Sequence, residues 1–157
     1  MNATRLRGRP ASPRLRRARG FTLIETMVTV GIAGVLSSMA YPNLESQVLR
    51  ARRSDGLVAI LQAQLAEERY RANNATYGSL AQAGLRGNSG AGLYALEVTL
   101  HSADGYVILA SAVGAQARDA SCRHLRLTLA DASLSYASGA DATTANGASA
   151  NRRCWSR

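Results

Sequence analysis

The pattern of hydrophobic and polar positions divides the chain into segments of different kinds. Between Phe21 and Tyr41, apolar and small residues follow one another almost without interruption, and Glu25 is the only carboxylate among these 21 residues. An α-helix of that length is about 30 Å long, which matches the hydrocarbon core of a bilayer. The segment therefore predicts a membrane-spanning helix. Pro42 cannot donate a backbone hydrogen bond, so we expect a kink near the membrane surface.

Beyond Pro42 the pattern becomes one-sided. Apolar side chains recur at helical spacing, whereas arginines, glutamates and glutamines occupy the other faces. The apolar stripe consists of Leu44, Val48, Ala51, Val58, Leu61 and Leu65. Asp55 interrupts this stripe. The two segments together predict one long kinked helix from about residue 21 to 73, ended by Asn73 and Asn74 because asparagine tolerates the left-handed backbone of a helix terminus.

The second half of the chain has the two-residue alternation of β-strands. After a loop over residues 74 to 92, rich in glycine, asparagine and serine, the alternation predicts a hairpin at about 94 to 113 and another that turns at 130 to 132. Short turns imply an antiparallel sheet of about four strands with one wet face. We expect the apolar stripe of the helix to pack on the leucine face of this sheet, which makes the fold α+β. The remaining C-terminal residues show little regular pattern.

The charges are distributed unevenly along the chain. The sequence contains no lysine, and seven of its 19 Lys+Arg residues precede Phe21, whereas all ten acids follow it. Twelve arginines therefore accompany ten acids after Gly20, so most of the net charge of +9 belongs to residues 1 to 20. A basic stretch before an apolar helix is a topology signal that keeps the N-terminus in the cytoplasm. This explains the charge better than nucleic-acid binding by the whole chain.

The two cysteines, Cys122 and Cys154, lie in the last quarter of the chain. They are too far apart for a Cys-x-x-Cys redox or metal motif. If the region after the apolar segment is exported, the pair most simply forms one disulfide in an oxidising compartment. The alternative is a pair of unpaired buried thiols.

Three interpretations compete for residues 1 to 41. In the first, the segment is an ordinary secretory signal cleaved at Ser38-Met39-Ala40, but the apolar run is long for such a signal and contains a costly carboxylate. In the second, the segment is a plain membrane anchor, and Glu25 reaches the inner interface. Neither interpretation explains the Gly20-Phe21 junction that precedes the helix.

The third interpretation rests on the string Gly20-Phe21-Thr22-Leu23-Ile24-Glu25, which resembles the prepilin signal of type IV pilins. The resemblance implies that prepilin peptidase cuts after Gly20 and methylates the new N-terminus at Phe21. It also implies that Glu25 pairs with the N-terminal amine of a neighbouring subunit during assembly. A buried carboxylate in a membrane is tolerable when it is paired, so the physical logic agrees.

The rest of the chain is similar to the type IV pilin plan. The implied parts are a cleaved basic leader (1–20), a transmembrane or filament-core half of the helix (21–42), an amphipathic half (43–73), and a region of loop, sheet and disulfide (74–157). Within the family, several stretches resemble PilE-like minor pilins. These are Glu67-Glu68-Arg69-Tyr70, Asn74-Ala75-Thr76-Tyr77, the segment 112–122 and Cys154-Trp155.

We therefore expect a non-enzymatic pilus subunit, a minor pilin, that has no cofactor. It would sit in the inner membrane with its head in the periplasm, and then enter an extracellular pilus. Its expected partners are other pilin subunits, prepilin peptidase, the inner membrane and the pilus assembly platform. His101 and His124 have no nucleophile or second base beside them in any motif, and no metal-ligand spacing is present.

Two alternative functions share the same fold. One is a receptor that captures DNA, because basic residues with an aromatic suit contacts to phosphates and bases. The candidate residues are Arg118, Arg123, Arg126, Arg152, Arg153, Arg157 and Trp155. Solvated surface charges that balance the acids explain these arginines equally simply, and we favour that explanation from the sequence. The other alternative is a type II secretion pseudopilin, against which the cysteine pair argues mildly.

Overall fold

The computed structural model describes residues 20 to 99 and 102 to 156, without the side chains of residues 40 to 43. The basic leader up to Arg19, His101 and Arg157 therefore lie outside the described residues. The side chain of Pro42 does so too, and the kink there stays a prediction. The chain divides into two units, one ending at Met39 and one beginning at Ala40, and each is considered by itself.

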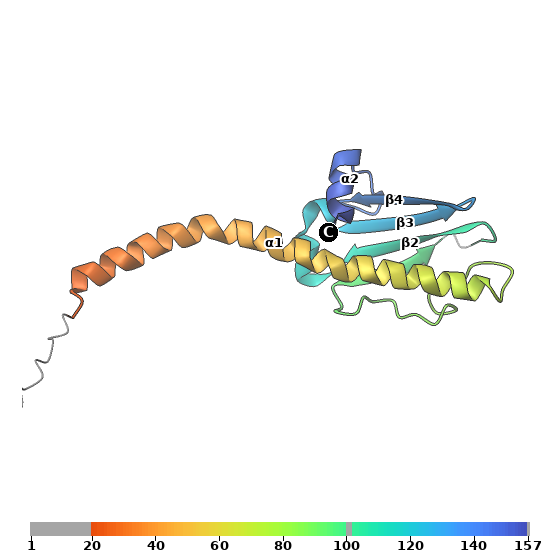
Figure 1. Ribbon diagram of the computed structural model, residues 1–157, viewed down its shortest axis with the longest axis horizontal. Coiled ribbons are helices and arrows are strands. Elements are labelled where there is room, and N and C mark those ends of the chain that lie inside the picture. Colours follow the sequence, from red (N-terminus) through yellow and green to blue (C-terminus); the bar gives the residue numbers. More distant parts are fainter. Residues whose placement is uncertain (1–19, 100–101, 157) are drawn as a thin grey trace, which may run out of the picture. The chain divides into compact units, whose positions relative to one another are not determined.

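Helix α1 spans Leu23–Arg71 and confirms the prediction of one long helix (Figure 1). It ends where the asparagines were expected to end it: Nδ2 of Asn73 donates to the carbonyl of Arg69, and Nδ2 of Asn74 donates to the carbonyl of Tyr70. These bonds satisfy carbonyls that have no partner inside the helix. Among the described residues, no single straight helix is both long and apolar enough to cross a membrane. The segments Leu23–Met39 and Leu44–Arg71 of α1 meet these requirements of length and composition only when they are taken together.

The four strands form one antiparallel sheet in the order β1-β2-β3-β4. The strands are β1 (Tyr94–Thr99), β2 (Gly105–Ala112), β3 (His124–Ala130) and β4 (Ser133–Gly139). Both predicted hairpins are therefore confirmed. A Cβ at Gly105 would lie 2.1 Å from the carbonyl oxygen of Leu129 on the neighbouring strand, so only glycine fits there.

The connection between β2 and β3 contains two short 3₁₀ helices, η1 (Gly114–Arg118) and η2 (Ala120–Cys122). A helix that the sequence did not predict, α2 (Ala148–Trp155), follows β4. The alternation rule missed α2 because the helix is polar along most of its length. Its one buried residue, Cys154, is held by the disulfide rather than by an apolar stripe.

The core lies between one face of the sheet and the part of α1 that runs along it (Figure 1). Its fully buried large side chains include Ile60 from α1, and Tyr94, Ile108, Leu125 and Leu127 from the strands. Each of these side chains contributes roughly 1.5 to 3 kcal/mol through its burial.

The prediction of which helix face packs on the sheet is wrong. The expected stripe, from Leu44 to Leu65, is exposed, and Leu65 keeps 56% of its surface in solvent. The buried face is instead the one that carries Gly56, Ile60 and Ala63. Small residues let the helix approach the sheet closely: a Cβ at Gly56 would lie 2.9 Å from the ring of Tyr94. This face packs on the sheet because its small residues let the helix backbone come close to the ring of Tyr94.

Asp55, which interrupted the predicted stripe, has a structural role. Its carboxylate accepts hydrogen bonds from Oγ of Ser89 (2.5 Å), the amide of Ala91 (2.9 Å) and the amide of Leu93 (3.4 Å). The residue thus fastens the loop between α1 and β1 to the helix. A carboxylate that accepts several hydrogen bonds at a half-buried position is compensated for its lost hydration.

Candidate functional site

The start of α1 carries the residues of the prepilin-like string. Gly20 and Phe21 precede the helix, and Thr22 and Glu25 form a reciprocal cap around its first turn. The amide of Glu25 donates to Oγ1 of Thr22 at 3.3 Å, and the amide of Thr22 approaches Oε2 of Glu25 at 3.5 Å. This is a Thr-x-x-Glu capping box, which places a negative charge at the positive end of the helix. The spacing was visible in the sequence and was overlooked there.

The apolar segment that follows is not covered by any described residue of its own unit. Every described residue from Gly20 to Met39 is exposed, including Ile24 (71%), Val30 (71%) and Leu36 (63%). Monomeric soluble proteins rarely expose a contiguous apolar surface of this extent. The segment therefore needs lipid or other protein chains around it.

We call the unit that begins at Ala40 the head. The face of α1 that points away from the sheet in the head is also partly apolar. Val58, Leu61 and Leu65 lie three and four residues apart, so they share one face of the helix, and their exposed fractions are 45%, 44% and 56%. We call these three residues the outer stripe. They lie on the opposite side of α1 from Ile60 and Ala63, so the helix is apolar on two sides and only one of these packs on the sheet.

Two tethers hold the C-terminal region of the head. Cys122 and Cys154 form a disulfide, with their Cα atoms 5.5 Å apart, and it joins η2 to α2. The second tether is the ion pair between Arg53 and Asp119, whose side chains are only 12% and 6% exposed. Nη1 of Arg53 also donates to the carbonyl of Arg153 at 3.0 Å. The sequence predicted the disulfide but not the ion pair, because 66 positions separate its partners.

The arginines proposed to contact DNA differ in their contacts and in their exposure. Arg118 pairs with Glu45 at 3.2 Å, and Nε of Arg123 donates to the carbonyl of Ala117. Arg126 donates to the carbonyl of Ala142 and is half-buried on β3. Arg152 and Arg153 are exposed on α2, the helix that also carries Trp155. Only this last group joins exposed positive charge to an aromatic side chain.

A pocket of about 510 Å³ lies between β4 and α2, and we call it the β4–α2 pocket. Its lining consists of Leu134, Ser135, Tyr136, Asn151, Arg152 and Trp155. The rings of Tyr136 and Trp155 meet edge to face, with centroids 4.9 Å apart and an interplanar angle of 65°. Nε1 of the indole donates to the carbonyl of Ala137 at 3.1 Å, which fixes the ring in place. The sequence named Trp155 and Arg152, but it did not place Tyr136 beside them.

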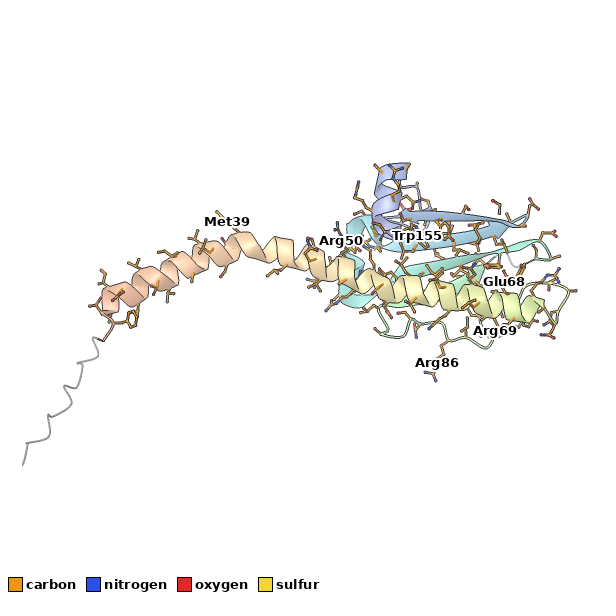
Figure 2. All side chains as sticks on the ribbon, in the orientation of Figure 1. Met39, Arg50, Glu68, Arg69, Arg86 and Trp155 are labelled. Carbon is orange, nitrogen blue, oxygen red and sulfur yellow. A yellow bond between two sulfur atoms is a disulfide. The ribbon has the colours of Figure 1, made fainter. Side chains whose placement is uncertain are left out.

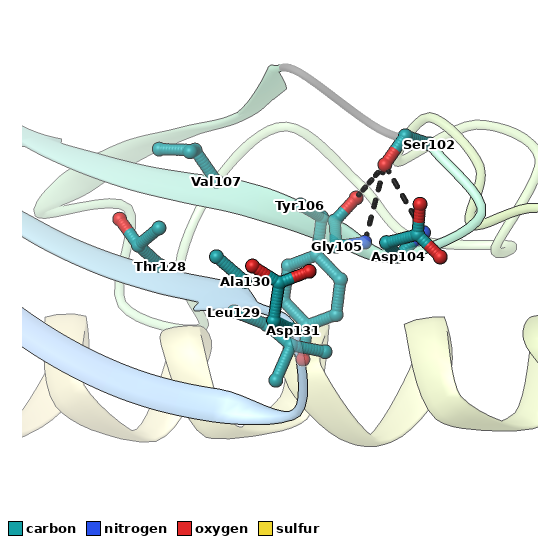
Figure 3. Close-up of a pocket in the computed structure, with 9 residues that line it drawn as sticks. All are labelled: Ser102, Asp104, Gly105, Tyr106, Val107, Thr128, Leu129, Ala130 and Asp131. Atoms are coloured by element: carbon teal, nitrogen blue, oxygen red, sulfur yellow. Dashed lines mark hydrogen bonds between the residues drawn. The ribbon is translucent and has the colours of Figure 1, made fainter.

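A second hollow, of about 210 Å³, lies where the two hairpin turns meet (Figure 3). Asp104 and Asp131 line it together with Tyr106. Its polar atoms shape the first turn, because the amides of Asp104 and Gly105 both donate to Oγ of Ser102 at 3.2 Å. The hollow therefore reflects turn structure, and its residues do not converge on a ligand.

Among the described polar groups of the head, one serine and one histidine lie side by side. Oγ of Ser111 lies 2.9 Å from Nδ1 of His124 across β2 and β3. Burial lowers the pKa of His124, and the nearby Arg123 lowers it further. No sequence motif placed a nucleophile beside His124, and Ser111 reaches it only across the sheet. Asp141, the acid that acts on the ring, is exposed. No group of three potential metal ligands occurs among the residues that the structure describes.

Two family models match the chain. The model described as "Type IV minor pilin ComP, DNA uptake sequence receptor" matches residues 42–126. The model described as "Prokaryotic N-terminal methylation motif" matches residues 15–41, which include Gly20, Phe21 and Glu25. The first match covers more than half of the chain, from the second part of α1 into β3.

The chain is also similar to subunits of a secretion machine. It is 36% identical over 91 residues to the type II secretion system core protein G of Pectobacterium carotovorum subsp. carotovorum, covering 58% of either chain. The corresponding protein of Dickeya chrysanthemi is 37% identical over 62 residues, or 40% of either chain. That of Klebsiella pneumoniae is 36% identical over 63 residues, or 45% of that protein. The chain thus spans less than two thirds of the length of these relatives.

Proposed function

Because this chain belongs to the type IV minor pilin family, we propose that it acts by assembly, as a subunit that enters a pilus through helix α1. The carrying observation is the exposed apolar helix from Leu23 to Met39, which lies within the segment that matches the methylation motif. A membrane covers such a segment before assembly, and the helices of other pilin subunits cover it afterwards. The family is structural rather than enzymatic.

Processing creates the group that assembly requires. In the proposed sequence of events, prepilin peptidase cuts between Gly20 and Phe21 on the cytoplasmic side, and Phe21 is methylated. The leader is removed, the helix stays in the inner membrane, and the head stays in the periplasm. Cleavage also generates a positively charged amine at Phe21, one residue before the Thr22 cap.

Glu25 has a role both before and during assembly. Its carboxylate caps its own helix, so it lies over the first turn, beside the position of the new amine. In a filament, the same carboxylate would meet the amine of a neighbouring subunit, and an ion pair would form where both groups lack water. Breaking such a pair by removing one partner leaves a buried charge and costs about 3 to 5 kcal/mol.

The experiment compares Glu25→Ala with Thr22→Val in cells that make filaments. Both substitutions break the capping box, but only Glu25→Ala removes the carboxylate that would meet the neighbouring amine. We expect Thr22→Val to enter filaments at near the wild-type level and Glu25→Ala to be excluded from them. Mass spectrometry of the mature protein checks the first step, with an N-terminus at methylated Phe21 as the expected product. Normal incorporation of Glu25→Ala would refute the assembly role of the carboxylate.

DNA capture is a second candidate function of the assembled subunit. The matching family model describes a DNA uptake sequence receptor, and this outweighs the preference for simple solvated charges that the sequence alone favoured. Exposed arginines with an adjacent aromatic group, on α2, provide a plausible contact surface. Binding of duplex DNA to the intact protein that weakens steeply with salt would support this role, and its absence at low salt would refute it.

A role as a pseudopilin of type II secretion is the remaining candidate, favoured by the core protein G relatives. Complementation separates it from the pilus role. Deletion of the gene should abolish pilus-dependent behaviour and leave protein secretion intact if the subunit belongs to a pilus. The reverse pattern would assign it to the secretion machine.

A further inference from the structure

We propose that the β4–α2 pocket binds an unpaired nucleotide of DNA, with the base against the Tyr136–Trp155 pair and the phosphate on Arg152. The ligand is thus a single strand or the frayed end of a duplex, rather than a continuous double helix. The inference rests on the proposed DNA-capture function and specifies which form of DNA one site takes.

The walls of the pocket are held rigidly. The disulfide at Cys154 anchors α2 one residue before Trp155, and the indole donates to the carbonyl of Ala137 on β4. Nδ2 of Asn151 donates to the carbonyl of Tyr136 at 2.7 Å, which ties the middle of the helix to the same strand. Preformed walls reduce the entropy lost on binding, so such a pocket is suited to a ligand.

The pocket exposes apolar surface that the fold could have covered. Tyr136 is the cross-strand partner of Leu127, so both side chains lie on the same face of the sheet. Leu127 is fully buried in the core, whereas Tyr136, one strand further out, keeps 45% of its surface exposed. Leu134 next to it keeps 40%. The leucine face of the sheet therefore ends in an uncovered apolar patch, bordered by an indole.

The charge beside this patch selects the class of ligand. Among the described residues, the recorded ion pairs engage Arg53 and Arg118, so the exposed Arg152 keeps its positive charge available. An aromatic platform next to a guanidinium suits a base that stacks and a phosphate that binds the cation. Bases inside a duplex are already stacked and cannot reach an aromatic ring, which is why the nucleotide must be unpaired.

The test uses the full-length processed protein in detergent micelles, with Trp155 as its probe, because Trp155 is the only tryptophan of the chain. Three probes of the same base composition are titrated: a single strand, a blunt duplex, and a closed duplex, namely a relaxed circular duplex that has neither ends nor loops. We expect the single strand to quench the Trp155 emission and to bind about ten-fold more tightly than the closed duplex. The blunt duplex should fall between them. Equal affinity for the single strand and the closed duplex would overturn the proposal.

Substitutions locate the effect. Arg152→Gln and Tyr136→Ala should each weaken single-strand binding, whereas Arg86→Gln should leave it unchanged. Arg86 is an equally exposed arginine on the loop before β1, and Figure 2 shows it away from Trp155. Arg152→Gln changes only an exposed side chain, so it preserves the fold even if Tyr136→Ala does not. Matching effects of Arg152→Gln and Arg86→Gln would also overturn the proposal.

The results distinguish failure of the pocket proposal from failure of the DNA-capture function. If all three probes bind with equal affinity and strong salt dependence, DNA capture stands and the pocket proposal fails. If no probe binds at low salt, the DNA-capture function fails as well. Assembly into filaments is judged by the Glu25→Ala experiment and is independent of both.

Discussion

Two regions of the molecule treat apolar surface in opposite ways. From Gly20 to Met39, every described residue is exposed although most are apolar, whereas in the head Leu125 and Leu127 of β3 are fully buried in the core. The head also pairs the nearly buried carboxylate of Asp119 with the guanidinium of Arg53. The residues from Ala40 onward thus have a buried core of their own, while the described residues before them have none. Substitutions that damage one region should leave the other intact.

The largest expected effect on the head comes from the ion pair between α1 and the η1–η2 connection. Arg53→Met leaves the nearly buried carboxylate of Asp119 without its cation, so the free energy of unfolding should fall by about 3 to 5 kcal/mol. Arg52→Met is the matched control, because Arg52 is an exposed neighbour, and it should change the stability by less than about 0.5 kcal/mol. Urea denaturation of the head measures both. Equal stability of the two variants would show that the pair does not stabilise the head.

Removal of the disulfide should have a comparable or slightly smaller effect. Cys122 and Cys154 are separated by 32 positions, for which the loop-entropy model predicts a loss of about 3 to 4 kcal/mol. The double variant Cys122→Ala plus Cys154→Ala should unfold at lower urea, and limited proteolysis should cut it first near α2. The helix segment before Met39 should keep its helicity in detergent. A head as stable as the wild type would contradict this prediction.

A pair of leucines tests the contrast between the regions directly. Leu127→Ala opens a cavity at a fully buried position and should destabilise the head by about 2 to 5 kcal/mol. Leu36→Ala makes the same chemical change at a side chain that is 63% exposed, so it should leave the unfolding of the head unchanged. Its effect should appear instead as reduced incorporation into filaments. The contrast fails if Leu36→Ala lowers the thermal midpoint of the head as much as Leu127→Ala does.

The smallest expected effect is a dependence on pH. Burial lowers the pKa of His124 in the folded head below its ordinary value, so below about pH 6.5 the unfolded chain takes up a proton more readily. The stability that the head gains by keeping His124 neutral is therefore present at neutral pH. It is lost as the pH falls through the pKa of His124 in the unfolded chain toward its lower pKa in the folded head. Thermal midpoints at pH 7.5 and 5.5 should therefore differ more for the wild type than for His124→Gln. An identical difference in both proteins would rule out His124 as the cause.

Much of the architecture could be predicted from local patterns. Continuous hydrophobicity and then helical spacing predicted α1 almost to its ends, and two-residue alternation predicted both hairpins. The methylation string was equally local, since it lies within six consecutive residues from Gly20 to Glu25. Such features depend on neighbours along the chain, and for them the sequence is sufficient. The capping box of Thr22 and Glu25 is also a local feature, so the sequence was sufficient to predict it.

The features that sequence reasoning missed depend on residues far apart in the chain. Helical spacing shows that α1 has apolar faces, but it does not reveal that Gly56 lets the ring of Tyr94 approach and so turns the outer stripe away from the sheet. Helical spacing likewise does not reveal that Asp55 accepts hydrogen bonds from the loop between α1 and β1. These outcomes are decided by close packing, because the core admits only the arrangement in which backbone and ring fit together.

The sequence by itself therefore determined the long helix, the antiparallel hairpins, the cysteine pair and the processing string, because each is set by local spacing or by chemistry within a short stretch. Only the tertiary structure decided which helix face is buried, which arginine holds Asp119, and that Tyr136 joins Trp155 and Arg152 in one pocket. The physical reason is that distant residues meet only when burial of the core brings their elements together, and their spacing in the chain does not encode that contact.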